Sequence, residues 1–77
     1  MSVREYPKFK FMPEWRNYAV KKCDWRRRIA LYDAISLYGC FAVEEELQNA
    51  EDQAYFETKV IPELDRQHKL LEDGKEI

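Results

Sequence analysis

The stretch DWRRRIALYDAISLYG, residues 24–39, decides the fold class because it contains a helix start, an apolar stripe and a helix stop. Asp24 has a side-chain oxygen that can accept a hydrogen bond at a helix N-terminus, and Gly39 can adopt the left-handed conformation that ends a helix. Between these two residues, apolar side chains recur at three- and four-residue steps: Trp25, Ile29, Tyr32, Ile35 and Tyr38. The pattern predicts an amphipathic helix of about four turns with this stripe facing the core.

Helical patterns lie on both sides of this stretch. Before it, Pro13 suits the first turn of a helix that reaches about Lys22. After it, residues from about 51 to 73 repeat apolar side chains at helical spacing and predict a long C-terminal helix. Pro62 interrupts this pattern, so we expect the helix either to kink near Lys59 or to split. Residues 40–49 fit a loop or a short helix equally well.

The N-terminal segment alternates basic and aromatic residues at positions 8–11, which favours an extended arm. The predicted fold is therefore all-α: a small antiparallel bundle of three or four helices with an extended N-terminal aromatic arm. We expect the arm to comprise residues 1–12, the bundle to be a single domain over residues 13–74, and residues 75–77 to form a tail.

Composition narrows the class of protein. A chain of 77 residues with 14% aromatic residues can build one core without a metal or a disulfide. Cys23 and Cys40 match neither a redox nor a zinc motif, so packed free thiols are favoured over a disulfide. No apolar run approaches the roughly twenty residues that span a bilayer, and the N-terminus lacks a secretory pattern. We therefore expect a cytoplasmic protein without membrane association.

The charge is divided between the two halves of the chain. The net charge is −2, but residues 1–38 hold nine basic and four acidic residues, whereas residues 39–77 hold four basic and eleven acidic residues. Basic residues gather where the first two predicted helices meet, and they form a candidate interaction surface: Lys21, Lys22, Arg26, Arg27 and Arg28. Phosphate binding is one use of this cluster. We favour two other uses over phosphate binding, because the whole chain is acidic: ion pairs between these residues and the acidic half of the chain, and contacts to a protein.

Aromatic residues outside the helical stripes complete this surface. The aromatic side chains that we expect to be left for a partner or a second copy of the chain are Tyr6, Phe9, Phe11 and Phe41. The acidic run at residues 44–46 is typical of a solvated face, or of a surface that meets a basic partner.

The sequence contains no recognisable catalytic pattern. His68 is the only histidine, and Asp65 and Glu72 share its helix face, which is a weak metal set; a hydrogen-bonded histidine in the helix seam is favoured. There is no glycine-rich phosphate loop and no nucleophile elbow. We expect no enzyme activity, no catalytic residues, no metal, no cofactor and no small-molecule substrate.

Three segments carry a family resemblance: FKF with the following Trp15, RIALYDAISLYG at residues 28–39, and FETKVIPELD at residues 56–65. With these segments the chain resembles a family of uncharacterised small helical domains encoded by bacterial phages and mobile elements, often near replication functions. The resemblance implies a non-enzymatic accessory protein that acts through protein contacts, either to itself or to a replication or host-defence component. The alternative is a nucleic-acid-associated domain that uses the basic cluster.

Overall fold

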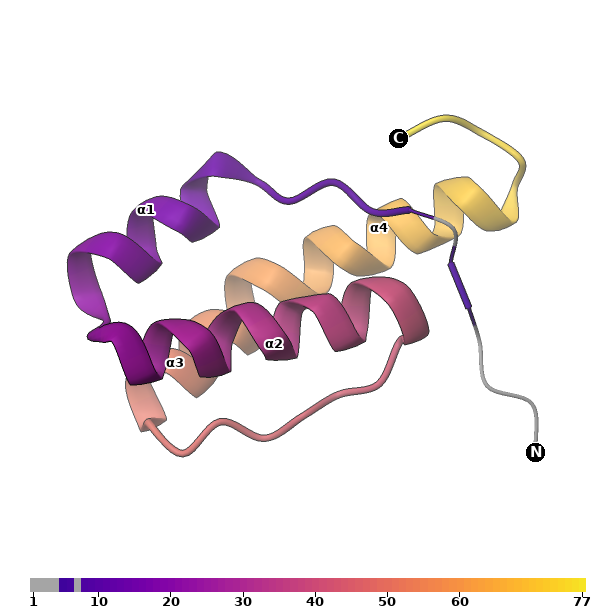
Figure 1. Ribbon diagram of the computed structural model, residues 1–77. Helices are drawn as coiled ribbons and strands as arrows, with labels where there is room; N and C mark the ends of the chain where they lie inside the picture. The colour runs from indigo at the N-terminus through magenta and orange to yellow at the C-terminus, as the bar shows by residue number, and fades with distance from the viewer. Residues whose placement is uncertain (1–4, 7) are drawn as a thin grey trace.

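The computed structural model describes residues 5, 6 and 8–77, and this part of the chain is all-helical with no strand. The helices are α1 (Pro13–Lys22), α2 (Trp25–Phe41), α3 (Ala50–Tyr55) and α4 (Ile61–Glu72), and a π-helical turn, η1 (Phe56–Val60), joins α3 to α4 (Figure 1). The predicted all-α class is thereby confirmed. Residues 1–4 and 7 of the predicted arm lie outside the described residues.

The start of α2 agrees with the sequence, but its end does not. Asp24 Oδ1 accepts a hydrogen bond from the Arg27 backbone N–H at 2.9 Å, as expected for a cap. The predicted stop at Gly39 is wrong, because the helix continues to Phe41. Ala42 then takes the left-handed conformation, with φ of 56°, and its N–H closes the helix on the carbonyls of Leu37 and Tyr38.

Gly39 serves another purpose, which is the close approach of the N-terminal segment. A Cβ atom at this position would lie 2.6 Å from the Phe9 ring, well inside van der Waals contact. The residue therefore lets an aromatic side chain lie directly on the backbone of α2. A glycine inside a helix costs about 1 kcal/mol relative to alanine, and this contact offsets part of that cost.

The C-terminal pattern forms one helical rod. Asn49 caps α3 by accepting from the Asp52 N–H, and helical backbone then continues to Glu72. The expected disturbance by Pro62 takes the form of η1, in which the Ile61 N–H bonds to the Phe56 carbonyl five residues back. This wider turn accommodates Pro62, at the start of α4, without dividing the rod.

Residues 42–49 have no helix, so the loop alternative holds for most of this segment. An extended chain spans at most about 3.5 Å per residue, and α2 rises about 1.5 Å per residue, so eight loop residues can return along the whole of α2. In Figure 1 the connection does run back beneath α2 to the start of α3.

Because the loop returns along α2, the predicted antiparallel order of the helices is wrong for one pair. Helices α1 and α2 are antiparallel, but α2 and the rod of α3, η1 and α4 run in the same direction (Figure 1). Arg27 near the start of α2 bonds to Asp52 in α3, whereas Gly39 near its end bonds to His68 in α4. Short connections make neighbouring helices antiparallel, and the extended return loop, residues 42–49, removes that constraint.

The segment ahead of α1 lies along α2 and α4. The Lys10 backbone N–H donates to Gln67 Oε1 at 2.7 Å, and Gln67 Nε2 returns a bond to the Lys10 carbonyl at 3.1 Å. Tyr6 stacks on His68 with 3.8 Å between ring centroids. The buried apolar core beneath comprises Trp15, Ala19, Cys23, Leu31, Ala34, Ile35, Leu47, Phe56, Val60 and Leu64.

Candidate interaction surface

The apolar stripe predicted on α2 divides into a buried and an exposed part. Ile35 is fully buried, but Trp25 and Ile29 are 64% and 60% exposed. The expectation that the whole stripe faces the core is therefore wrong at its N-terminal end. The buried face of the helix is formed instead by Leu31, Ala34, Ile35 and Gly39.

Two arginines occupy the inward positions of the first turns of α2. Arg27 reaches across to α3, where Nε lies 2.8 Å from Asp52 Oδ2 and a terminal nitrogen lies 2.6 Å from Oδ1. Arg28 turns back to α1 and donates to the carbonyls of Ala19 and Cys23, each at 3.2 Å. These carbonyls belong to the C-terminal end of α1, where a cation is favoured.

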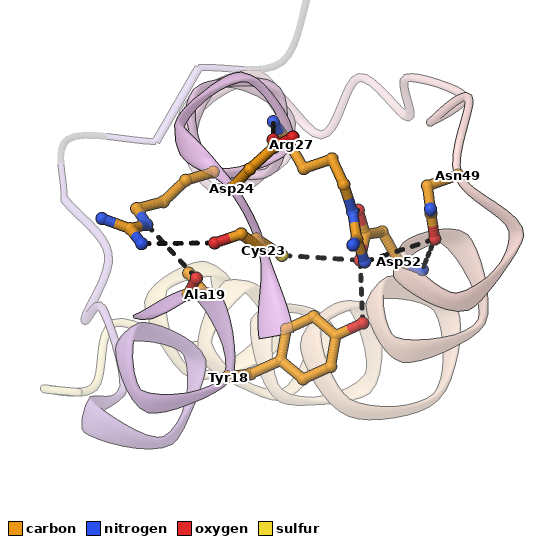
Figure 2. A network of polar contacts seen from close by, with 8 residues as sticks. Tyr18, Ala19, Cys23, Asp24, Arg27, Asn49 and Asp52 are labelled. Atoms are coloured by element: carbon orange, nitrogen blue, oxygen red, sulfur yellow. Dashed lines mark hydrogen bonds and ion pairs between the residues drawn. The ribbon is translucent and has the colours of Figure 1, made fainter. Parts of the chain in front are cut away.

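Asp52 is the centre of a buried polar network that joins three helices (Figure 2). Its carboxylate accepts the bidentate pair from Arg27, a hydrogen bond from the Tyr18 hydroxyl at 2.8 Å and a weaker one from the Cys23 thiol at 3.5 Å. Only 2% of Asp52 is exposed, so the carboxylate is satisfied by these groups rather than by water.

This network sets the protonation of its members. The hydrogen bonds from Arg27 lower the pKa of Asp52 below its usual range, against the opposing effect of burial. Burial, aided by the Asp52 charge, raises the pKa of the Tyr18 hydroxyl and raises the pKa of the Cys23 thiol to about 11. Both groups therefore stay protonated and act as donors at neutral pH.

The basic cluster predicted from the sequence is accordingly divided. Arg27 and Arg28 are bound within the fold, whereas Lys21, Lys22 and Arg26 are exposed. The Arg26 guanidinium lies 5.2 Å from the centroid of the Trp25 ring, a cation–π distance. We call Trp25, Ile29, Lys21, Lys22 and Arg26 the basic–apolar patch.

The three predicted surface phenylalanines also differ from one another. Phe9 is half-buried against Gly39. Phe11 is 38% exposed and packs edge-on against Trp15 and Tyr32. Phe41 is likewise 38% exposed, at the opposite end of α2 from the basic–apolar patch. Phe9 and Phe11 therefore both make contacts within the fold, and Phe9 is the more buried of the two.

A groove of about 570 Å³ follows one side of α2. One wall belongs to the helix and includes Arg26, Ala30 and Asp33, and the other belongs to the return loop and includes Glu45 and Glu46. The groove therefore brings part of the basic–apolar patch and part of the acidic run onto the same side of the molecule.

His68 occupies the seam between α2 and α4, as the sequence favoured. It is 5% exposed, and its Nε2 atom lies 2.9 Å from the Gly39 carbonyl oxygen. The two carboxylates considered with it serve tyrosines: Asp65 accepts from the Tyr38 hydroxyl, and Glu72 accepts from the Tyr6 hydroxyl at 2.8 Å.

The sequence indicated that acids such as Asp52 could pair with the basic cluster at the surface, but it did not show that Asp52 is buried. An available signal was the spacing of Asn49 and Asp52, which matches a helix cap and the third residue of a first turn. The partners of Asp52 in α1 and α2 are distant in sequence, and only the tertiary fold identifies them.

Comparison with known proteins yields no match, whether with family models, curated proteins or solved structures. Within residues 5, 6 and 8–77, no helix is long and apolar enough to cross a bilayer.

Proposed function

We propose that this chain is a non-enzymatic interaction module that binds protein through the basic–apolar patch. The observation that carries the proposal is the exposure of Trp25 and Ile29, at 64% and 60%, on one face of α2. Tryptophan dominates interface hot spots, and fully burying a side chain such as isoleucine contributes about 1.5–3 kcal/mol. Binding a partner that covers Trp25 and Ile29 would therefore lower the free energy by removing their apolar surface from water.

The resemblance of three sequence segments to phage and mobile-element domains supports a proposal about the kind of protein this is and where it acts. We place the chain in the cytoplasm as a phage or mobile-element accessory protein that binds itself or a replication or host-defence component. The fold that presents the patch would be a small helical bundle, in which the N-terminal aromatic arm packs across α2 and α4.

The alternative is a nucleic-acid-associated domain. Its support is weaker than the sequence alone suggested, because Arg27 is bound to Asp52 and Arg28 to backbone carbonyls. Three exposed cations remain in the cluster: Lys21, Lys22 and Arg26. Each phosphate contact contributes about one unit to the slope of log affinity against log salt, so three cations support only weak, salt-sensitive binding.

Photo-crosslinking in bacterial cells producing this chain tests the proposal. A benzoylphenylalanine at position 25 should form protein adducts, and Arg26→Glu in the same chain should reduce their yield. The control places the same group at Lys59, an exposed position in η1. Nuclease-sensitive adducts at position 25 would support the nucleic-acid alternative, and equal yields at positions 25 and 59 would reject the patch as an interface.

A further inference from the structure

We infer that the groove between α2 and α4 beneath the N-terminal segment is a second binding site, which takes an extended, basic segment with an aromatic side chain from a partner protein. In the chain alone, residues 5, 6 and 8–10 occupy this groove as a displaceable ligand, and we call them the strap (Figure 1). We call the surface beneath them the strap groove: Gly39, Cys40, Gln67, His68 and Glu76. This site is separate from the basic–apolar patch and does not depend on it.

The strap groove recognises extended backbone. Gln67 is fully buried, and its side-chain amide pairs with both backbone groups of Lys10: Oε1 accepts from the N–H at 2.7 Å, and Nε2 donates to the carbonyl at 3.1 Å. Nε2 also donates to Glu63 at 2.9 Å. Nearer the N-terminus, the Tyr6 N–H donates to the Cys40 carbonyl at 2.8 Å. Because these bonds use backbone atoms of the strap, other extended segments can form them too.

Side chains in the groove determine which segments fit. An aromatic ring fits over Gly39 because this residue has no side chain, and a Cβ atom there would lie 2.6 Å from the Phe9 ring. Beside the ring, the Lys8 ammonium lies 3.2 Å from the Glu76 carboxylate. The groove therefore favours a segment in which an aromatic residue adjoins a basic one.

The strap can leave the groove without exposing a large apolar surface. Gln67 and His68, the buried α4 side chains beneath it, are polar and would be hydrated when uncovered. His68 keeps its contact with the Gly39 carbonyl, which belongs to α2 and not to the strap. The strap contains no helix, and its two lysines are exposed. Segments with few buried apolar contacts open at the lowest cost in free energy.

A cavity beside the strap favours a partner protein over a second copy of the chain. The cavity has a volume of about 420 Å³ and is lined by Tyr6 and His68, so it adjoins the strap groove. Its charged lining residues are one cation and three carboxylates: Lys69, Asp65, Glu72 and Asp73. A second copy offers the same strap, which makes no contact that the covalently attached strap does not already make at high effective concentration. A partner segment with a cation at this cavity makes an additional favourable contact.

The test is fluorescence anisotropy with a labelled, amidated peptide of the strap sequence EYPKFK, residues 5–10. The receptor is the full chain with Tyr6→Ala and Phe9→Ala, which we call the open variant because its strap lacks both ring contacts. The peptide should bind the open variant at least about tenfold more tightly than the natural chain, in which the strap competes for the groove. A Glu5→Arg peptide should bind about fivefold more tightly still, and this gain should fall with salt.

Gly39→Ala in the open variant is the matched control. The new Cβ atom meets no Phe9 ring in this strap, but it blocks the place of the corresponding ring of the peptide. Peptide binding should therefore be lost. A Phe9→Ala peptide should likewise fail to bind the open variant, because it cannot fill the space above Gly39.

Circular dichroism shows whether the open variant is folded. If it is unfolded, an excess of the peptide should refold it, because a ligand that binds only the folded state shifts the equilibrium. Three outcomes would overturn the inference: no binding and no refolding, binding that Gly39→Ala leaves unchanged, or no gain from the Glu5→Arg peptide. A natural chain that dimerises in sedimentation, and no longer does so as the open variant, would assign the groove to the strap of a second copy and reject the partner protein.

Discussion

At the scale of single residues, Asp52 determines how α1, α2 and α3 meet. Its carboxylate accepts from Tyr18, Cys23 and Arg27, and removing the charge leaves these donors poorly paired in a buried place. We expect Asp52→Asn to lower the free energy of unfolding by about 2–3 kcal/mol at pH 7. Urea denaturation measures this change. Asp73→Asn, an exposed substitution, is the control and should have almost no effect.

The same carboxylate gives stability a pH dependence of known sign. Because the pKa of Asp52 is lowered in the folded state, its contribution is present above the ordinary pKa of aspartate and is lost as pH falls through the lowered value. Urea midpoints measured from pH 7 down to pH 2 should therefore fall less steeply in Asp52→Asn than in the natural chain. A parallel fall in both proteins would contradict the charged pairing with Arg27.

The two thiols should differ in reactivity. Cys23 is 6% exposed and its pKa is raised to about 11, so almost none of it is thiolate at pH 8, whereas Cys40 is half-buried. We expect a disulfide reagent at pH 8 to label Cys40 in the folded protein and Cys23 only after unfolding. In Cys40→Ser the labelling of the folded protein should vanish. Two thiols reacting at one rate would show that Cys23 is not held in the Asp52 network.

At the scale of elements, the contact between the N-terminal segment and α2 depends on the missing side chain of Gly39. In Gly39→Ala the new Cβ would lie 2.6 Å from the Phe9 ring, so the ring must move. We expect a loss of about 1–3 kcal/mol in the free energy of unfolding, as for other overpacked sites. In a Phe9→Ala background the same substitution should cost much less, and denaturation of the four proteins of this cycle measures the coupling. If the losses in the free energy of unfolding from the two substitutions were additive, Phe9 would not contact residue 39 in the folded protein.

How far the elements could be predicted depends on whether their causes are local. Asp24 and Pro13 act on neighbouring backbone, and the sequence placed both helix starts correctly. Gly39 was misread as a helix stop because its reason, the Phe9 ring, comes from thirty residues earlier in the chain. Pro62 was correctly expected to disturb its helix, but periodicity does not distinguish a kink from a π turn.

The candidate interaction surface could also be predicted only where its causes are local in the sequence. The apolar stripe of α2 was visible in the sequence, but apolar character does not say which residues a neighbouring helix covers. Arg27 and Arg28 resembled members of a free basic surface, and only their tertiary partners show that they hold α1, α2 and α3 together. Lys21, Lys22 and Arg26 remain as the part of that prediction that is exposed.

At the scale of the whole molecule, the parallel course of α2 and the rod brings opposite charges beside one helix. The return loop leaves the C-terminal end of α2 and runs back to the start of α3 (Figure 1). A short antiparallel connection would have kept the chain at the C-terminal end of α2 instead. Because the loop returns along α2, Glu45 and Glu46 line the same groove as Arg26, and the topology gathers basic and acidic side chains on one side of the molecule.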